Sequence, residues 1–171
     1  MIKKTLFIFT ILLSFQGIAQ KDIFTIARNG TVEEVKEIMK SNPSAINELN
    51  DRGFSPLILA CYKNNNEVAK FLVDSVKDLD VTTEMGTALM AAVVKGNVEI
   101  GTYLLERNAN PNLTDSNGIT ALMYAVQFKN VALVKALLEH KADKTLLDKN
   151  GKTAFEYAVF SENKEIINLL K

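Results

Sequence analysis

A repeated segment of about 33 residues constrains the fold of this 171-residue chain more than any other feature. Short polar segments ending in Gly recur along the chain, and each leads into a Ser or Thr followed by small and apolar residues. The Ser/Thr positions are Ser55, Thr87, Thr120 and Thr153, separated by 32, 33 and 33 residues. Repetition at this spacing is typical of a solenoid, because a unit that cannot bury its apolar face alone must stack on its neighbours.

The sequence of each unit predicts two helices joined by a tight turn. The Ser or Thr suits an N-cap, because its side-chain oxygen accepts a hydrogen bond from a free N–H of the first turn. Gly96-Asn97, and Asn residues at the matching position of the preceding unit, favour a break after a short first helix, because both types tolerate positive φ. Apolar residues then recur at helical spacing, at Val98, Ile100, Leu104 and Leu105 in the third unit.

These residues resemble the ankyrin repeat family, whose pattern is roughly D-x-x-G-x-T-P-L-H-x-A-A-x-x-G-H-x-E-V-V-K-x-L-L-x-x-G-A-D-x-N. The segments 28–36, 95–100 and 148–155 match it closely, and the match extends from Lys21 to Lys171. The resemblance implies an all-α ankyrin repeat solenoid of about five helix-turn-helix units with hairpin-like loops. We place the repeat domain at 20–171, with units at about 20–50, 51–81, 82–114, 115–147 and 148–171. Another α-solenoid is the alternative.

Two departures from the family pattern affect the turns. The His that follows the T-P-L segment is replaced in every unit, by Ile58, Met90, Met123 and Glu156. Because this removes the usual Thr–His hydrogen bond, we expect less rigid turns. The third unit is one residue short before Thr87, so we expect its loop over 78–84 to have a different shape.

The N-terminal residues have the pattern of a secretory signal peptide. Lys3 and Lys4 precede an apolar run over 5–15, and small residues at 17 and 19 suit cleavage after Ala19. The apolar run is too short for a transmembrane anchor, which needs about 18–20 apolar residues, so we expect no stable membrane anchor. We therefore predict a signal peptide over 1–19 and a periplasmic or secreted protein, with a bacterial-looking signal.

Composition excludes several classes of function. The chain has 20 basic and 20 acidic residues, and loss of Lys3 and Lys4 with the signal would leave a net charge of −2. Neither balance suits a nucleic-acid binder, which needs a basic surplus. One Cys and one His exclude Cys-rich zinc sites and His-rich metal sites. We expect no metal and no cofactor.

No arrangement of residues predicts catalysis. The single His140 falls near the end of a second helix, where a cation is favoured by the helix dipole. Cys61 falls on an inward-facing position, so we expect a buried, inert thiol. Nucleophile-elbow, metalloprotease, phosphate-loop and dinucleotide motifs do not occur in the sequence. We therefore expect a protein that is not an enzyme.

The candidate binding residues follow from the resemblance, because ankyrin proteins bind through their turn tips and the exposed side of the first helices. On the turns they are Asp51, Arg52, Phe54, Glu84, Asn117, Ile119, Lys149 and Lys152. On the first helices they are Tyr62, Lys63, Val94, Lys95, Gln127, Phe128 and Phe160. Six of them are apolar or aromatic, more than a solvated surface requires, which favours an interface stripe. Packing of some of them against neighbouring units is the alternative.

The leading functional hypothesis is an exported, non-enzymatic module, monomeric, that binds an unidentified protein through its concave face. An inhibitor or immunity protein, or an accessory protein, of an envelope enzyme is a more specific version. A structural envelope protein and an enzyme with an unrecognised site are the alternatives.

Overall fold

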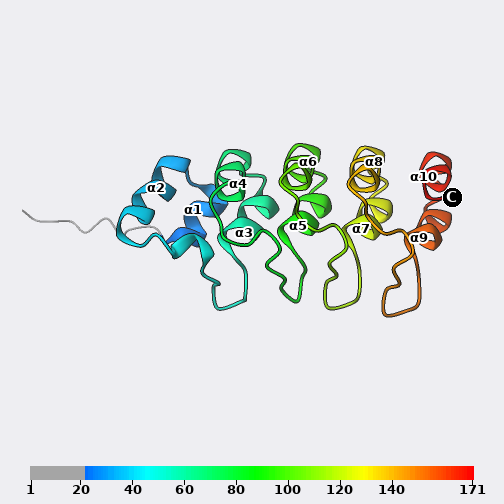
Figure 1. Cartoon of the computed structure of the whole chain (residues 1–171), viewed down its shortest axis with the longest axis horizontal. Coiled ribbons are helices and arrows are strands. Elements are labelled where there is room, and N and C mark those ends of the chain that lie inside the picture. The colour runs from blue at the N-terminus through cyan, green and yellow to red at the C-terminus, as the bar shows by residue number, and fades with distance from the viewer. Residues whose placement is uncertain (1–21) are drawn as a thin grey trace, which may run out of the picture.

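Five helix pairs follow one another along residues 22–171, the part of the chain that the computed structural model describes (Figure 1). They are α1 (Ile23–Asn29) with α2 (Val32–Ser41), α3 (Pro56–Lys63) with α4 (Asn66–Val73), α5 (Ala88–Val94) with α6 (Val98–Glu106), α7 (Ala121–Gln127) with α8 (Val131–Glu139), and α9 (Ala154–Ser161) with α10 (Lys164–Leu170). A 3-10 helix, η1 (Ala45–Asn47), follows α2. The described residues contain no strand, and the predicted all-α solenoid is confirmed. The predicted signal peptide lies outside them.

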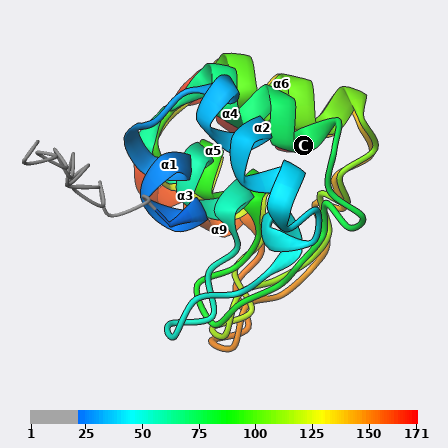
Figure 2. The ribbon, with the colours of Figure 1, turned by 90° about the vertical axis from the view of Figure 1, so that its left-hand side faces the viewer.

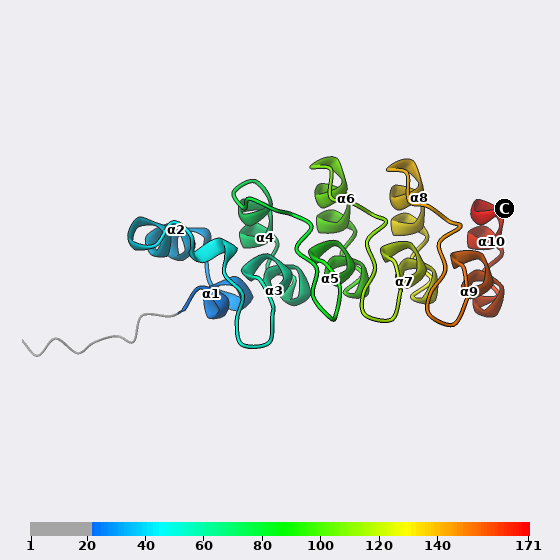
Figure 3. The same cartoon turned by 60° about the horizontal axis from the view of Figure 1, so that its bottom comes forward.

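The helices form two layers. The first helices of the pairs (α1, α3, α5, α7 and α9) make one row, and the second helices make an outer row beside it (Figures 1 and 3). Each first helix packs on the first helix of the next unit. Seen from the end of the stack, the pairs superpose and the turns all project to the same side (Figure 2). The first helices and the turns therefore border a common inner face.

The predicted N-caps begin the first helices. The hydroxyls of Ser55, Thr87, Thr120 and Thr153 each accept a hydrogen bond from the backbone N–H three residues later. Asn97, Asn130 and Asn163 cap second helices in the same way. Each such cap stabilises its helix by about 1 kcal/mol, so the repeated polar positions are a structural requirement of the stack.

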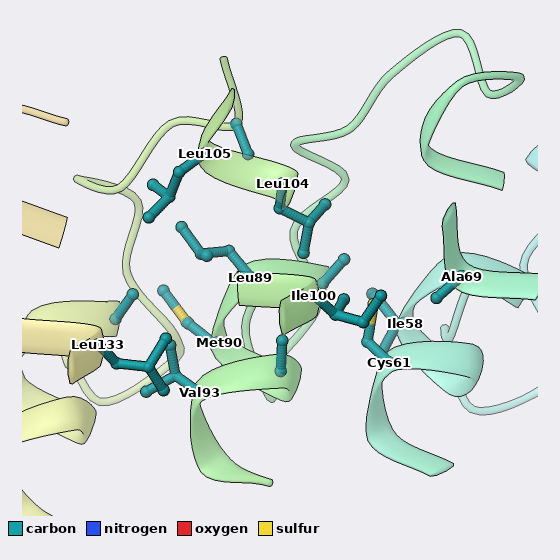
Figure 4. Close-up of a cluster of buried hydrophobic side chains, with 14 of the residues drawn as sticks. Ile58, Cys61, Ala69, Leu89, Met90, Val93, Ile100, Leu104, Leu105 and Leu133 are labelled. Atoms are coloured by element: carbon teal, nitrogen blue, oxygen red, sulfur yellow. The ribbon is translucent and has the colours of Figure 1, made fainter. Parts of the chain in front are cut away.

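The core is a continuous band of aliphatic side chains between the two layers. In the third unit, Leu89, Met90 and Val93 of α5 belong to one cluster with Ile100 and Leu104 of α6 (Figure 4), and all five are at most 1% exposed. Leu133 reaches the same cluster from the next unit. Truncation of a buried Leu to Ala costs about 2–5 kcal/mol. Because each unit contributes to its neighbour's core, the band fixes the spacing of the first helices.

Left-handed residues end the first helices of four units. Asn64 and Gly96 have positive φ of 57° and 66°, as the sequence predicts. Lys129 and Glu162 adopt the same conformation, with φ of 54° and 57°, although neither residue type favours it. The repeat geometry therefore imposes the turn on these two positions.

The turns before α7 and α9 are held by an aspartate and a tyrosine. One carboxylate oxygen of Asp115 accepts from the N–H groups of Asn117 and Ile119, and the other accepts from the Tyr124 hydroxyl at 2.7 Å. Asp148 binds the Tyr157 hydroxyl in the same way, at 2.5 Å. The turn before α3 has Asn50 in the equivalent position and no such tyrosine. In the last two units, these bonds hold the turns in place of the missing Thr–His hydrogen bond.

The turn before α5 differs in shape, as its shorter sequence predicts. Thr83 and Gly86 exchange two backbone hydrogen bonds around Glu84 and Met85. The later turns are joined to their neighbours by backbone hydrogen bonds, from Ser116 N–H to the Glu84 carbonyl and from Lys149 N–H to the Asn117 carbonyl. The tips of the third, fourth and fifth units therefore form one connected edge.

Candidate functional site

A hollow of about 560 Å³ lies where the first helices meet the turns, and we call it the inner groove. Its lining comes from α1, α3, α5 and α7 and from the turns before α3 and α5. The lining residues are Arg28, Arg52, Phe54, Ile58, Leu59, Tyr62, Lys63, Met85, Thr87, Met90, Ala91, Val94, Tyr124 and Phe128. Volumes of 300–1,000 Å³ are typical of ligand sites, so the inner groove is large enough to enclose bulky side chains of a partner.

Large apolar side chains are presented at the inner groove. Tyr62, Phe128 and Met85 are 45%, 53% and 68% exposed, respectively. Phe128 stacks on Tyr124, with ring centroids 6.4 Å apart and an angle of 17° between the rings. Because Tyr124 donates a hydrogen bond to Asp115, the interaction that holds the turn before α7 also positions this aromatic pair. Aromatic and Met side chains are enriched at protein interfaces, so this arrangement is suited to binding a partner.

The charged residues of the inner groove are all cations. They are Arg28 at the end of α1, Arg52 on the turn before α3 and Lys63 at the end of α3. Lys95, beside the groove, lies 5.1 Å from the ring centroid of Tyr62. Within residues 22–171, none of these four cations forms an ion pair with Asp or Glu. The site therefore combines an apolar floor with unpaired positive charge.

The predicted binding residues divide into three groups. Arg52, Phe54, Tyr62, Lys63, Val94 and Phe128 line the inner groove together. The other exposed or half-buried ones lie outside its lining: Asp51, Glu84, Lys95, Asn117, Gln127, Lys149, Lys152 and Phe160. No observation tests whether any of them binds a partner, so this role stays a prediction.

Ile119 alone makes up the third group, the buried residues. The prediction that it lies at the surface is wrong. It is 8% exposed and belongs to the core cluster, and its N–H donates to the carboxylate of Asp115. The neighbouring turn covers this region closely, because a Cβ placed on Gly118 would lie 3.0 Å from the backbone nitrogen of Lys149. Packing, the alternative reading of the apolar turn positions, therefore applies to Ile119.

Phe160 and Lys152 lie together at the last unit, away from the inner groove. Phe160 is 73% exposed, and the Lys152 ammonium lies 4.9 Å from its ring centroid and 5.9 Å from that of Tyr157. A cation over an aromatic face is attracted by the ring quadrupole. This contact leaves most of Phe160 accessible.

Met85 is a groove residue that the sequence reasoning missed. It occupies the tip of the shortened turn, where its side chain is exposed and lines the inner groove. The signal available in the sequence is a large apolar residue next to Gly86 in a two-residue turn. Tyr124 was missed as well, and its regular spacing from Asp115, repeated by Tyr157 and Asp148, could have revealed it.

The two side chains considered for catalysis, Cys61 and His140, lie in surroundings that suit a structural role. Burial raises the pKa of the Cys61 thiol to about 12, so the thiolate that a nucleophile needs is not formed at neutral pH. His140 Nδ1 lies 2.9 Å from the Ala136 carbonyl oxygen at the end of α8. In residues 22–171, no three His, Cys, Asp or Glu side chains come together in a way that could hold a metal ion. In the same range, no helix is long and apolar enough to cross a membrane.

Comparison with known proteins assigns the repeats to a family. A family model for ankyrin repeats (3 copies) matches residues 23–115 and 103–171. Ankyrin repeat and SAM domain-containing protein 6 of Mus musculus is 37% identical over 101 residues, which are 58% of this chain and 11% of the mouse protein. Putative ankyrin repeat protein FPV014 of Fowlpox virus is 34% identical over 92 residues, 53% of this chain and 21% of the viral protein.

A putative ankyrin repeat protein of Borreliella burgdorferi is 31% identical over 68 residues, 39% of this chain and 31% of that protein. The chain thus spans about a third or less of the length of these relatives. The similarity concerns the repeats themselves.

Proposed function

Since the chain belongs to the ankyrin repeat family, we propose that it is a non-enzymatic protein–protein interaction module whose inner groove binds a partner protein. Ankyrin repeats are generally protein-interaction modules, which supports the class of function. The observation that carries the site is the joint exposure of Tyr62, Met85 and Phe128 in one hollow. Exposed apolar patches of this kind mark interaction sites, because water is released from them on binding.

Preorganisation is the proposed mechanism of recognition. The first helices are fixed by the shared core, and the Phe128 ring stacks on Tyr124. A surface that is ordered before binding loses little conformational entropy on association. The partner can therefore be recognised by shape and charge without rearrangement of the repeats.

We further propose that the protein acts after export, with residues 1–19 removed as a signal peptide. The support is the sequence of that segment, with Lys3 and Lys4 before an apolar run and a small residue at Ala19. Mass spectrometry of the protein purified from the periplasm or medium tests this proposal. We expect the mature protein to begin at Gln20. An unprocessed chain retained in the cytoplasm would contradict the export proposal.

The partner is then itself an exported protein. In its more specific form, the proposal is that this protein inhibits, protects or assists an envelope enzyme. A purely structural role in the envelope predicts that the apolar side chains of the inner groove can be removed without consequence. The two ideas are distinguished by the same variants.

The proposal is tested by capture of partners from an envelope fraction on immobilised protein. We compare the wild type with the double variant Tyr62→Ala/Phe128→Ala, whose side chains line the inner groove. The control is Val98→Ala/Leu49→Ala, which removes apolar side chains 38% and 53% exposed that do not line the groove. We expect a captured protein that the groove variant loses and the control retains. Equal capture of the same partner by the wild type and both variants would contradict the proposal.

A further inference from the structure

Charge is distributed unevenly between the outer row of helices and the inner groove. The ion pairs found within residues 22–171 lie on the outer row or at the ends of its helices. They join Lys40 to Glu37, Lys70 to Glu99, Arg107 to Asp74 and Lys135 to Glu165. On the outer row, these cations are neutralised by neighbouring acids of the same chain.

The inner groove has cations without such partners. Arg52 and Lys63 are exposed, form no ion pair among the described residues, and share a lining that contains no Asp or Glu. Arg28 is half-buried and contributes to a lowered pKa of Asp22, which is due chiefly to a hydrogen bond from the Thr25 N–H. Cations beside a low-dielectric wall attract carboxylates more strongly than isolated surface charges do. The charged side chains that line the inner groove are therefore all positive, on a chain with equal numbers of acidic and basic residues.

The charged residues of the inner groove lie at one end, and its two most exposed apolar side chains lie at the other. Arg28, Arg52 and Lys63 belong to the first two units, whereas the exposed Met85 and Phe128 belong to the third and fourth. The exposed aromatic ring of Tyr62, on α3, belongs to the second unit together with Arg52 and Lys63, so apolar surface also adjoins the cations. An occupant that matches both parts must carry negative charge at one end and a bulky apolar side chain at the other.

We propose that the inner groove binds a short acidic segment of the protein partner. Asp or Glu side chains of that segment lie over Arg28, Arg52 and Lys63, and a Phe, Leu or similar anchor lies against Met85 and Phe128. Arg can bind a carboxylate through two parallel hydrogen bonds, which adds direction to the attraction. This inference rests on the proposed function and specifies the chemistry of the partner at the same site.

Selection from a phage-displayed library of random 12-residue peptides identifies the preferred occupant. Selected sequences are made as fluorescein-labelled peptides, and their dissociation constants are measured by fluorescence anisotropy. We expect Asp and Glu to be enriched toward one end and Phe or Leu toward the other. Replacement of the acids by Asn and Gln should weaken binding at least tenfold, and binding should weaken as salt rises, because salt screens exposed charges.

Matched charge reversals test the contribution of the cations. Arg52→Glu/Lys63→Glu should weaken binding of the acidic peptide at least tenfold. Lys77→Glu/Lys164→Glu makes the same change in net charge at exposed positions outside the groove lining and should leave binding within twofold. Circular dichroism of both variants checks that the helices are retained.

Three results would overturn the inference. The first is a set of peptides that lose binding with Tyr62→Ala/Phe128→Ala but show no acidic enrichment, which leaves the proposed function standing. The second is a selection that yields no groove-dependent peptide. The third concerns vesicles of phosphatidylcholine and phosphatidylglycerol (3:1). If Arg52→Glu/Lys63→Glu weakens binding to these vesicles more than binding to any selected peptide, the cations bind lipid headgroups instead. The proposed function itself is judged separately, by capture of the partner.

Discussion

Replacement of Asp115 measures how firmly the turn before α7 is locked. Asp115 is 7% exposed, and its side chain accepts hydrogen bonds from the N–H groups of Asn117 and Ile119 and from the Tyr124 hydroxyl. Asp115→Ala removes both acceptor oxygens and with them all three hydrogen bonds. The exposed Asn117 N–H can turn to water, but the Ile119 N–H is buried and loses its partner.

The expected cost follows from these partners. A buried donor left without an acceptor costs about 1–3 kcal/mol, and loss of the bond to the half-buried Tyr124 hydroxyl adds about 1 kcal/mol. We therefore expect Asp115→Ala to lower the free energy of unfolding by about 2–4 kcal/mol. At about 2–4 °C per kcal/mol for a protein of this size, the melting temperature should fall by several degrees.

The chain provides its own control for this experiment. Asn50 occupies the equivalent position before α3, and its amide oxygen accepts from the N–H groups of Arg52 and Phe54 at 2.9 and 3.0 Å. Asp115→Asn should therefore keep the turn and cost less than about 1 kcal/mol, because its amide group can donate to the Tyr124 hydroxyl. Tyr124→Phe should cost about 1 kcal/mol, and the double variant with Asp115→Ala should cost less than the sum of the single changes.

Urea unfolding followed by far-ultraviolet circular dichroism measures these differences. If Asp115→Ala lies within about 0.5 kcal/mol of the wild type, a typical surface value, the turn is not locked by this side chain. If Asp115→Asn is as damaging as Asp115→Ala, the negative charge matters rather than the hydrogen-bond geometry. Either result contradicts the reasoning.

Three further predictions concern single residues. Lys129→Gly should stabilise the protein by about 1 kcal/mol, because Gly adopts the left-handed conformation without the Cβ penalty, whereas Lys129→Ala should give no gain in the same urea titration. The pKa values of Tyr124 and Tyr157 are raised to about 12, by burial and the Asp115 hydrogen bond for Tyr124 and by the Asp148 hydrogen bond, then burial, for Tyr157. Because the neutral phenols are favoured in the folded state, their stabilisation is complete below pH 10, the ordinary pKa, and is lost as pH rises toward 12. Absorbance at 295 nm should show these two hydroxyls ionising near pH 12, with one lost in each Tyr→Phe variant, and ionisation of both near pH 10 in folded protein refutes the assignment. Cys61 should not react with a thiol reagent in the native protein and should react in urea; rapid native labelling contradicts its burial.

The sequence was sufficient for the architecture because each unit repeats the same local signals. Ser55, Thr87, Thr120 and Thr153 cap first helices as expected, since capping depends on residues within one turn of the chain. The altered third turn was also predicted, because one missing residue shortens a hairpin directly. These features depend on neighbours in the sequence.

The candidate site was only partly predictable, because exposure depends on contacts between units. The positions of Phe54 and Ile119 are equivalent in the repeat, yet Phe54 is half-buried and lines the inner groove whereas Ile119 is buried under the adjoining turn. The repeat pattern treats both positions alike. Met85 became a groove residue through the shortened turn that presents it, which the spacing of the repeats could not show.

The unpaired charge of the inner groove was likewise outside the reach of composition. Equal numbers of acidic and basic residues describe the whole chain but not the lining of the inner groove. Lys70 and Lys63 are seven residues apart, yet only Lys70 finds a carboxylate, at 2.5 Å from Glu99 of the next unit. Which cation is neutralised depends on how the units stack.

The central claim is that the partner binds in the inner groove, and site-specific photocrosslinking in living cells tests it most directly. A photoreactive phenylalanine derivative is introduced at Phe128 in the groove, at Tyr62 beside the cations, or at Val98 on the outer row. All three side chains are exposed, by 53%, 45% and 38%, so access to the probe is similar. We predict the same crosslinked partner from Phe128 and Tyr62 and none from Val98. A partner crosslinked from Val98 alone would contradict the account.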